Sequence, residues 1–584
     1  MFQRIQTYFK NLQKKHALAL VSMVVGIVAG LLAVALKSLV SGIQFLLVLG
    51  SDFGGLKWWY VLYPIFGLSF VWFLVHKVFK FNPGSGIPVV LQAISKRRSK
   101  LKKKQVLTTF FSSAVTVGFG GSAGLEGPTV QVASAVASWL SSYWKLDYKT
   151  RTMLLACAAA GSMAAIFKAP IAAIVFAVEV IMIDLTAMSM VPLLVASLSA
   201  FLTTYLFLGN GQIIQLSLRT GFELKHLHHY ILLGVLCGFG SVYFTRIYLL
   251  VIKVIGNLKS SRKQILIAGV GLGLIFTLFP ALYGEGYDII NSFLKGSIYA
   301  VSQNSMLEDL TNNASLTVLF LLAILLMKAV ATGLTMGAGG IGGIFAPTLF
   351  MGSALGMIYS RIWNAFTAAS IPVSNVVLVA MAGLVAGVLH APLTSIFLIA
   401  ELSGGYSLFV PLMISSGVAF YISKGLNRHN IYTMELAQRG ELITHDKDQA
   451  VLTLMSLSEE IETNFSPVFP HQKLRELIDI IAASKRNLFP VINEHNKLVG
   501  VIGLDDMREH MFNQEKYDEY TAADFMVAPS ITINYSDKMD DVMNKFDKSN
   551  AWNIPVIKDD QYIGFVSKSK LFSAYRGRLK ETSL

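Results

Sequence analysis

Two glycine-rich blocks in strongly apolar sequence constrain the fold of this chain more than any other feature. The block at 118–129 (GFGGSAGLEGPT) aligns without a gap with the block at 337–348 (GAGGIGGIFAPT). Each ends in a Pro-Thr step and leads into a fresh apolar helix, predicted at 130–140 and 349–358, and only the first carries an acid, Glu126. Irregular loops that feed helix N-termini at membrane depth bind anions, because unpaired N–H groups and the helix dipole both favour negative charge.

The internal match continues beyond these blocks. Residues 161–171 resemble 383–393, and each copy reaches an acid nine residues after its proline, Glu179 in the first and Glu401 in the second. Recurring small residues on a helix-packing face explain isolated spacings but not two collinear blocks. The membrane region is therefore predicted to be two related halves with a binding site between them, near the midplane.

The composition excludes a protein that is soluble throughout. The chain has 584 residues, of which 54% are hydrophobic and only 14% charged, and its mean hydropathy is +0.56. Several apolar stretches are shorter than the roughly 20 residues of a full span or are cut by Gly and Pro. The predicted fold class is a polytopic α-helical membrane protein with broken and re-entrant helices and a cytoplasmic α/β tail.

The domain boundaries follow changes in composition. We expect a cytoplasmic N-terminal segment at 1–16, a transmembrane domain at 17–435, a linker at 436–464 and a tail domain at 465–584. The two halves of the transmembrane domain are placed at about 56–208 and 229–424.

The net charge of +14 is unevenly distributed. Basic residues cluster before the first span and in a short loop: Arg4, Lys10, Lys14 and Lys15, then Lys96, Arg97, Arg98, Lys100, Lys102, Lys103 and Lys104. Both clusters, and with them both termini, are predicted to be cytoplasmic in a multi-pass protein of the cell membrane. A collar at the membrane surface is favoured over nucleic-acid binding, because no aromatic platform accompanies the loop.

Other chemistries find little support in the sequence. Cys157 and Cys237 lie in apolar segments, so neither a disulfide framework nor a cysteine metal site is indicated. The histidines at 226, 228 and 229 have no patterned carboxylate, and a polar interfacial loop explains them, so no metal site is assigned. No nucleophile–base arrangement is visible, and the chain is not expected to be an enzyme.

A third helix-breaking loop lies at 81–88 (FNPGSGIP). Gly84 and Gly86 would let the backbone approach a ligand, and Ser85 adds a hydroxyl donor. Alone, the loop is equally compatible with a tight turn.

Four segments in the same order along the chain carry a family resemblance. The segments 84–88 (GSGIP), 124–128 (GLEGP), 343–347 (GIFAP) and 431–432 (IY) resemble the CLC family of chloride channels and chloride/proton exchangers. The resemblance implies a homodimer in which each subunit holds its own anion pathway between two inverted halves.

The resemblance also implies roles for individual residues. The hydroxyls of Ser85 and Tyr432 and the N–H groups of Ile344 and Phe345 would hold a central chloride, and Glu126 would be the gating glutamate. The remaining loop positions of the chloride-binding set are Gly86, Ile87 and Gly127. Hydroxyls and helix N-termini suit this task, because they attract an anion without the trapping effect of a full charge.

The charge state of Glu126 predicts how the pathway opens. When ionised, the carboxylate should occupy an anion site itself, and when protonated it should swing away and admit the ion. Opening at low pH follows from this, so the chain is expected to be voltage- or pH-gated.

Two positions depart from the pattern of the family. Leu125 stands where many relatives have arginine, which removes a cation from the outer mouth. Val180 stands where proton-coupled relatives usually have an internal glutamate, next to Glu179. Because valine cannot carry a proton, the sequence favours a passive chloride channel, with a chloride/proton antiporter as the alternative, and leaves Glu179 as either a relay or a structural acid.

The tail contains a second repeat, in which 489–502 matches 554–566. It resembles a pair of CBS motifs, which in relatives bind adenine nucleotides. By that resemblance ATP, ADP or AMP would contact Asp506, Ser567, Lys568 and Lys570. The motif is split between the two copies, so a structural tail that stabilises the dimer is an equal alternative, and no cofactor is required.

Overall fold

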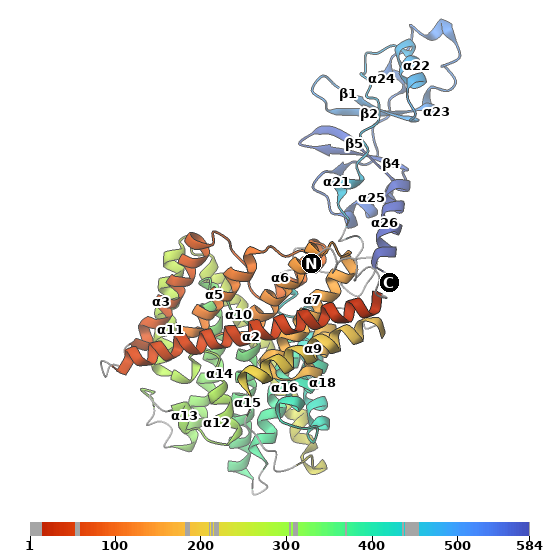
Figure 1. The fold of residues 1–584 in the computed structure, drawn as a ribbon. Coiled ribbons are helices and arrows are strands. Elements are labelled where there is room, and N and C mark those ends of the chain that lie inside the picture. Colours follow the sequence, from red (N-terminus) through yellow and green to blue (C-terminus); the bar gives the residue numbers. More distant parts are fainter. Residues whose placement is uncertain are drawn as a thin grey trace. The chain divides into compact units, whose positions relative to one another are not determined.

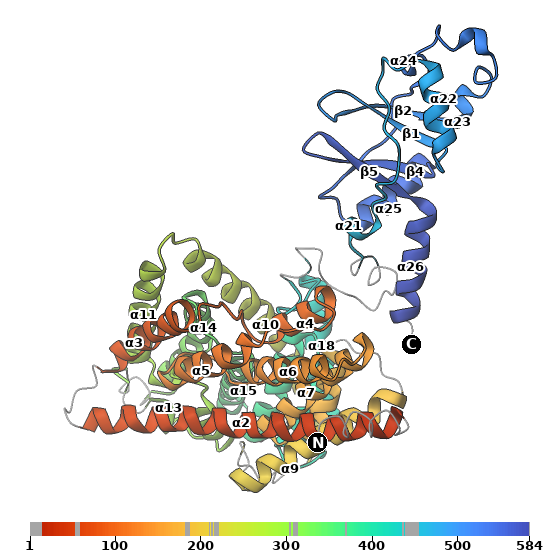
Figure 2. The same ribbon diagram turned by 45° about the horizontal axis from the view of Figure 1, so that its top comes forward.

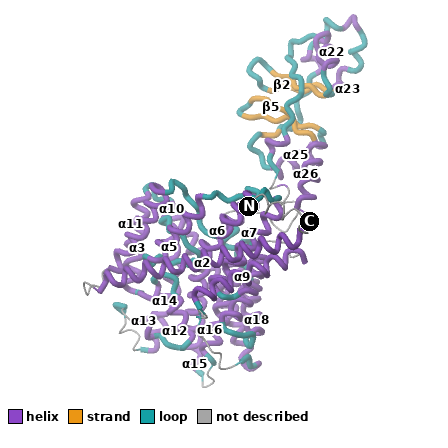
Figure 3. Tube along the Cα trace, viewed as in Figure 1, coloured by secondary structure: helices purple, strands orange, loops and turns teal. Residues whose placement is uncertain are grey.

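The computed structural model describes residues 14–582 except 53–58, 182–186, 210, 212–213, 215–220, 303–304, 308–312, 368–370, 435–436, 438–451 and 453–454. Most of the expected N-terminal segment and most of the linker at 436–464 lie outside the described residues. The chain forms two compact units, Met1–Gly440 and Glu441–Leu584. Figures 1 and 3 show that the first is helical and that the strands of the described residues lie in the second.

The first unit consists of helices and short helical turns. In its first half these are α2 (Lys14–Asp52), α3 (Trp59–Phe73), the π-helical turn η1 (Leu74–Val78), α4 (Ile87–Lys96), α5 (Lys104–Gly118), α6 (Glu126–Tyr143), α7 (Tyr148–Phe167), α8 (Pro170–Glu179) and α9 (Ala187–Leu208). In its second half they are η2 (Leu224–His226), α10 (Leu227–Gly256), α11 (Ser261–Leu278), η3 (Pro280–Leu282), α12 (Tyr287–Leu294), α13 (Tyr299–Ser302), α14 (Ala314–Gly337), α15 (Phe345–Phe366), α16 (Val373–Leu389), α17 (Pro392–Leu402) and α18 (Phe409–Leu426).

Helix length separates membrane-crossing segments from broken ones. Within the described residues, eight helices are long and apolar enough to cross a membrane. By contrast, α4, α8 and α17 have only 10 or 11 residues, about half of what a span requires. This mixture confirms the predicted fold class. Figure 2 shows the longest helix, α2, running along α9, against which it packs.

The two halves repeat the same breaks in their helices. α5 and α14 end at the first glycine of each block, and α7 and α16 both end in a left-handed residue, Lys168 (φ 55°) and His390 (φ 53°). The helices after the blocks begin earlier than expected, at Glu126 and Phe345. Proline is compatible with a first helical turn, because its missing N–H would have no partner there in any case.

Equivalent residues of the two blocks contact one another reciprocally. The N–H of Gly124 donates to the carbonyl of Gly343 (2.8 Å), and the N–H of Gly343 donates to the carbonyl of Gly124 (2.7 Å). The hydroxyl of Thr116 accepts from Ile341, and that of Thr335 accepts from Ser122. Each of these bonds has a counterpart in which the equivalent residues of the two halves exchange roles. This pattern is typical of two-fold pseudosymmetry.

The repeated acids cap helices in opposite halves. Glu179 accepts from the N–H of Leu393 (3.1 Å) and from both the N–H and the hydroxyl of Thr394 (2.7 Å each). Glu401 accepts from the N–H groups of Ile171 (3.1 Å) and Ala172 (2.8 Å). Each carboxylate therefore satisfies the N-terminus of α17 or α8 from across the pseudosymmetric interface.

The second unit contains a two-stranded and a three-stranded sheet with flanking helices. Antiparallel β1 (Leu488–Ile492) and β2 (Leu498–Gly503) form one sheet; β3 (Ile533–Asn534) pairs in parallel with β4 (Asn553–Lys558), which pairs antiparallel with β5 (Gln561–Ser567). The helical elements are α21 (Leu457–Glu460), α22 (Leu474–Ala483), α23 (Leu504–Met507), η5 (Gln514–Lys516), α24 (Ala522–Phe525), α25 (Met539–Ser549) and α26 (Lys568–Thr582).

Each tail motif has its own apolar core. Phe489 and Ile502 belong to the first core, and Phe546 and Val556 belong to the second. Glu462, near the start of the first motif, pairs its main chain with Phe565 of β5 in the second. These main-chain hydrogen bonds between Glu462 and Phe565 join the two motifs within the unit.

The reciprocal caps predict a similar loss of stability in two variants. Glu179→Ala and Glu401→Ala should each leave the N–H groups at one helix N-terminus without their carboxylate partner and cost about 1–2 kcal/mol. Both variants should therefore lower the melting temperature of the purified protein in detergent by a similar amount. Glu494→Ala, at an exposed turn of the tail, is the control. A loss confined to one of the two caps would contradict the symmetric role.

Candidate functional site

Three glycine backbones meet where the irregular loops converge. A Cβ on Gly86 would lie 3.3 Å from the Cα of Gly127, and one on Gly127 would lie 3.3 Å from the Cα of Gly343. A Cβ on Gly343 would lie 2.9 Å from the nitrogen of Gly127. The loop at 81–88 therefore belongs with the two glycine blocks and is not an isolated turn.

A buried glutamine holds the first of these loops. The side chain of Gln131 accepts from the N–H of Gly86 (2.8 Å) and donates to the carbonyl of Pro83 (2.8 Å). The half-buried Ser85 donates its hydroxyl to the carbonyl of Gly342 (3.1 Å), which links this loop to the second block. The N–H of Gly86 is thus already engaged, so Gly86 contributes close backbone approach.

The other expected chloride contacts lie at helix N-termini or are buried hydroxyls. Ile87 is the first residue of α4, Phe345 is the first residue of α15, and Ile344 caps α15. The hydroxyl of Tyr432 is buried and has no hydrogen-bond partner in the described part of the chain. A buried hydroxyl without a partner is costly, and an anion would satisfy it.

Glu126 lies fully buried among these groups. Its Oε1 accepts from the hydroxyl of Tyr287 at 2.6 Å. Its Oε2 has no hydrogen-bond partner within the described residues, and the N–H of Ala346, in the first turn of α15, lies close enough to stabilise negative charge on the carboxyl group. The carboxylate therefore faces the N-terminus of the helix that follows the other block.

Charged residues from outside the blocks surround Glu126. Lys37 of α2 interacts electrostatically with both Glu126 and Glu285, and its Nζ donates to the carbonyl of Ile166 (3.2 Å). Glu285 accepts from the N–H of Leu125 at 3.1 Å. A lysine from a distant helix thus supplies a cation in the neighbourhood of Leu125, where the sequence resemblance leads us to expect an arginine.

A second lysine lies deeper, on α14. Lys328 is fully buried; its Nζ lies 3.1 Å from the carbonyl of Gly284 and 4.7 Å from the ring centre of Phe350. It also interacts electrostatically with Glu285. Carbonyls, an aromatic face and a carboxylate together offset the cost of burying its charge.

Val180 caps the C-terminus of α8 and is buried. The carboxylate of its neighbour Glu179 accepts hydrogen bonds from the N-terminus of α17. These bonds support a structural role for Glu179.

Sequence reasoning missed five residues of this site: Lys37, Gln131, Glu285, Tyr287 and Lys328. A signal existed for the two lysines, since each is the only charged residue of its apolar span, Ala17–Leu47 and Ala314–Gly337. An ionisable residue in such a span is by default a functional candidate. For Gln131, Glu285 and Tyr287, the repeated sequence gives no comparable indication of a functional role.

The histidines at 226, 228 and 229 pack with one another and with aromatic rings. His229 hydrogen-bonds the hydroxyl of Tyr359 (2.9 Å) and lies edge-on to Trp363. No group of three or more His, Cys, Asp or Glu side chains within the described residues is placed to hold a metal.

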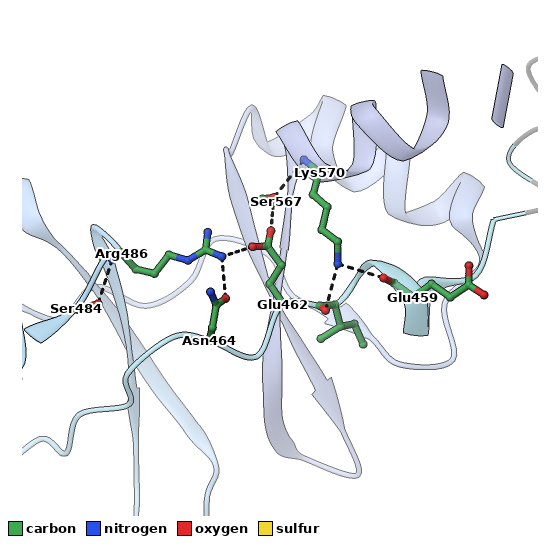
Figure 4. Close-up of polar contacts among 8 residues, drawn as sticks. Glu459, Glu462, Asn464, Ser484, Arg486, Ser567 and Lys570 are labelled. Atoms are coloured by element: carbon green, nitrogen blue, oxygen red, sulfur yellow. Dashed lines mark hydrogen bonds and ion pairs between the residues drawn. The ribbon is translucent and has the colours of Figure 1, made fainter. Parts of the chain in front are cut away.

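Three of the four side chains expected to contact a nucleotide are engaged within the protein. Asp506 caps α23 by accepting from the N–H of Gly503 (2.8 Å). Ser567 donates to Glu462 (2.5 Å), and Lys570 donates to the carbonyl of Glu459 (3.1 Å). Figure 4 shows these contacts of Ser567 and Lys570. Lys568 is the half-buried first residue of α26.

Glu462 is the centre of this tail cluster. Figure 4 shows its carboxylate between Ser567 of the second motif and Arg486 of the first, with which it forms an ion pair. Partial burial alone would raise the pKa of Glu462, but the bonds from Ser567 and Arg486 outweigh it, so this pKa lies below its usual value.

Family models match both units. A model described as "Voltage gated chloride channel" matches residues 67–424. A model of the CBS domain matches 459–513 and 522–577.

Individual proteins match over most of the chain. A protein of Ralstonia nicotianae named as a ClcB-like chloride channel protein is 28% identical over 71% of this chain and 95% of its own length. A protein of Vibrio campbellii named H(+)/Cl(-) exchange transporter ClcA is 32% identical over 63% of this chain and 77% of its own length. The crystal structure of a slow cyanobacterial Cl-/H+ antiporter superposes with a TM-score of 0.63 at 24% identity, covering 74% of this chain and 99% of that one.

The tail cluster predicts acid sensitivity. Because the pKa of Glu462 is lowered in the folded state, its contribution to stability is present above about pH 4.5 and is lost as the pH falls through the folded value. Hydrogen exchange of β5 in the full-length protein, corrected for intrinsic rates, should therefore accelerate between pH 6 and 3.5. Glu462→Gln should exchange faster at pH 6 and change less on acidification. Equal pH dependence in both proteins would contradict this assignment.

Proposed function

Because the chain belongs to the voltage gated chloride channel (CLC) family, we propose that it transports chloride across a membrane in exchange for protons, with Glu126 as gate and proton acceptor. The observation that carries the proposal is the position of this buried carboxyl group, which lies among the three converging loops and faces the N-terminus of α15. In that position an ionised Glu126 competes with chloride for the same positive environment.

The geometry supports a simple cycle. Ionised Glu126 fills the anion path and is stabilised by the Tyr287 hydroxyl and by the dipole of α15. Protonation removes the charge that holds it there, so the side chain can leave and chloride can enter. The hydroxyls of Ser85 and Tyr432 and the N–H groups of Ile344 and Phe345 then bind the ion without a full positive charge, and it can leave again.

Exchange and passive conduction each have one argument in their favour. The relative that is 32% identical is named as a proton/chloride exchanger, whereas Val180 leaves the usual internal proton position without an ionisable group. The sequence alone places the channel first. We place the exchanger first, because overall similarity reflects many positions and Val180 is a single one. In such an exchanger the inner proton route does not use residue 180.

We extend the proposal to assembly and orientation. The chain would form a homodimer with one pathway per subunit, in the cell membrane, with both termini cytoplasmic. Exposed apolar side chains on α8, α9, α17 and α18 support a partner or lipid on that face: Ile171, Leu194, Leu198, Leu393 and Met413. The basic loop at 96–104 supports the orientation.

Flux from liposomes tests the function. With valinomycin present, purified protein should release chloride and drive protons uphill in a fixed ratio. Chloride release without proton movement would establish the passive channel, and absence of any anion flux would contradict chloride transport itself.

The role of Glu126 has its own test. Glu126→Gln should mimic the protonated gate, so that chloride flux at pH 7.5 rises about tenfold or more, no longer changes between pH 4 and 8, and carries no protons. Glu494→Gln is the control. The gating role is wrong if wild-type and Glu126→Gln flux follow the same pH profile.

For the tail, we propose that an adenine nucleotide binds only by displacing Glu462 from Ser567. The carboxylate occupies a hydroxyl that the resemblance assigns to the nucleotide, and a second negative charge beside a phosphate would be repelled.

Calorimetry tests the tail proposal directly. In titrations of the full-length protein with ATP, ADP and AMP, Glu462→Ala should bind at least tenfold tighter than the wild type, and a further Asp506→Ala change should weaken binding. No heat at millimolar nucleotide in either protein would leave the tail as a scaffold.

A further inference from the structure

A tyrosine outside both glycine blocks holds the gate carboxyl group. The hydroxyl of Tyr287, the first residue of α12, donates to Oε1 of Glu126 at 2.6 Å. Oε2 has no partner within the described residues, so this is the only side-chain hydrogen bond that the described residues give to the Glu126 carboxyl group.

The turn before Tyr287 is fixed on both sides. Gly284 (φ 66°) donates its N–H to the carbonyl of Gly120 in the first block at 3.0 Å. Gly286 (φ 88°) lies so close to α15 that a Cβ there would be 2.6 Å from the ring of Phe350. Tyr287 is therefore presented to the gate by backbone that contacts both halves.

The same turn contacts the chain immediately before the gate. Glu285 accepts from the N–H of Leu125 at 3.1 Å, and Leu125 is the N-terminal cap of α6. The segment 284–287 thus contacts Gly120, Leu125 and Glu126.

The charged and titratable groups that face the gate come from several elements. Lys37 of α2, Glu285 of the turn, Tyr287 of α12 and Tyr432 beyond α18 interact electrostatically with Glu126. Lys328 of α14 faces Glu285. Tyr287 stabilises the charged gate through a bond, Lys37 does so through its charge, and Glu285 opposes that charge.

We propose that the Glu285–Gly286–Tyr287 turn is a latch that sets the pH at which the gate opens. Tyr287 is a positioning residue: its hydroxyl holds ionised Glu126 in the anion path, and opening breaks this bond. Glu285 acts in the opposite sense, because its own charge makes a second negative charge on Glu126 less favourable. The proposal rests on chloride transport gated by Glu126.

Two substitutions in the turn should have opposite effects. Tyr287→Phe removes the bond that favours the ionised gate, so the pH of half-maximal chloride flux should rise by about one unit, since a hydrogen bond to a charged group changes an equilibrium about tenfold. Glu285→Gln keeps an acceptor for Leu125 but removes the charge, so the same midpoint should fall. Tyr243→Phe is the matched control, because that hydroxyl bonds the Leu326 carbonyl (3.1 Å) and not a carboxylate.

The decisive comparison measures the effect of Tyr287→Phe on chloride flux in a protein that already carries Glu126→Ala. A latch has nothing to hold in that background, so the flux profiles of Glu126→Ala with and without the Tyr287 change should coincide. An unchanged midpoint in Tyr287→Phe, or an equal effect in both backgrounds, would overturn the latch. Absence of chloride flux in the wild type would instead overturn the transport proposal, so the two failures are distinguishable.

Discussion

The hydrogen bonds between Gly124 and Gly343 are the contact on which the rest of the membrane unit depends. Backbone away from water must find partners within the protein, and irregular loops have no helical partners of their own. Each block supplies the partner that the other lacks, down to the reciprocal bonds of Thr116 and Thr335. Helix ends can therefore meet at this depth, and their unpaired N–H groups make the centre attractive to anions.

The gate arises from one difference between the two otherwise similar blocks. Glu126 and Phe345 stand at equivalent positions of the two blocks, and each is the first residue of a helix, α6 or α15. One carries a carboxylate and the other a ring, which packs 5.1 Å from that of Phe167. Because the two blocks contact each other symmetrically, the acid of the first block faces a helix N-terminus of the other half. Lys37 and Tyr287, which stabilise the charge of this acid, come from segments outside the two blocks.

The sequence was sufficient for the architecture and insufficient for the surroundings of the gate. Collinear repeats record symmetric contacts, so the two halves and the converging loops could be predicted, and the CLC and CBS resemblances are confirmed. Tyr287 and Glu285 lie outside both blocks and have no equivalent in the repeat, and their approach to Glu126 depends on how α12 packs. The helices after the loops begin at Glu126 and Phe345, four residues before the predicted starts, because proline fits within a first helical turn and so does not mark the boundary.

The exchanged caps also bear on how the protein is made. The N-terminus of α8 is completed by Glu401, whose partner Ile171 lies 230 residues earlier in the chain. At ribosomal speeds of about 5–20 residues per second, the first half waits on the order of ten to fifty seconds for that carboxylate. During this interval the N–H groups at Ile171 and Ala172 have no Glu401 carboxylate to bond. Completion of the first half is thus a late event in biosynthesis, tied to the arrival of the second.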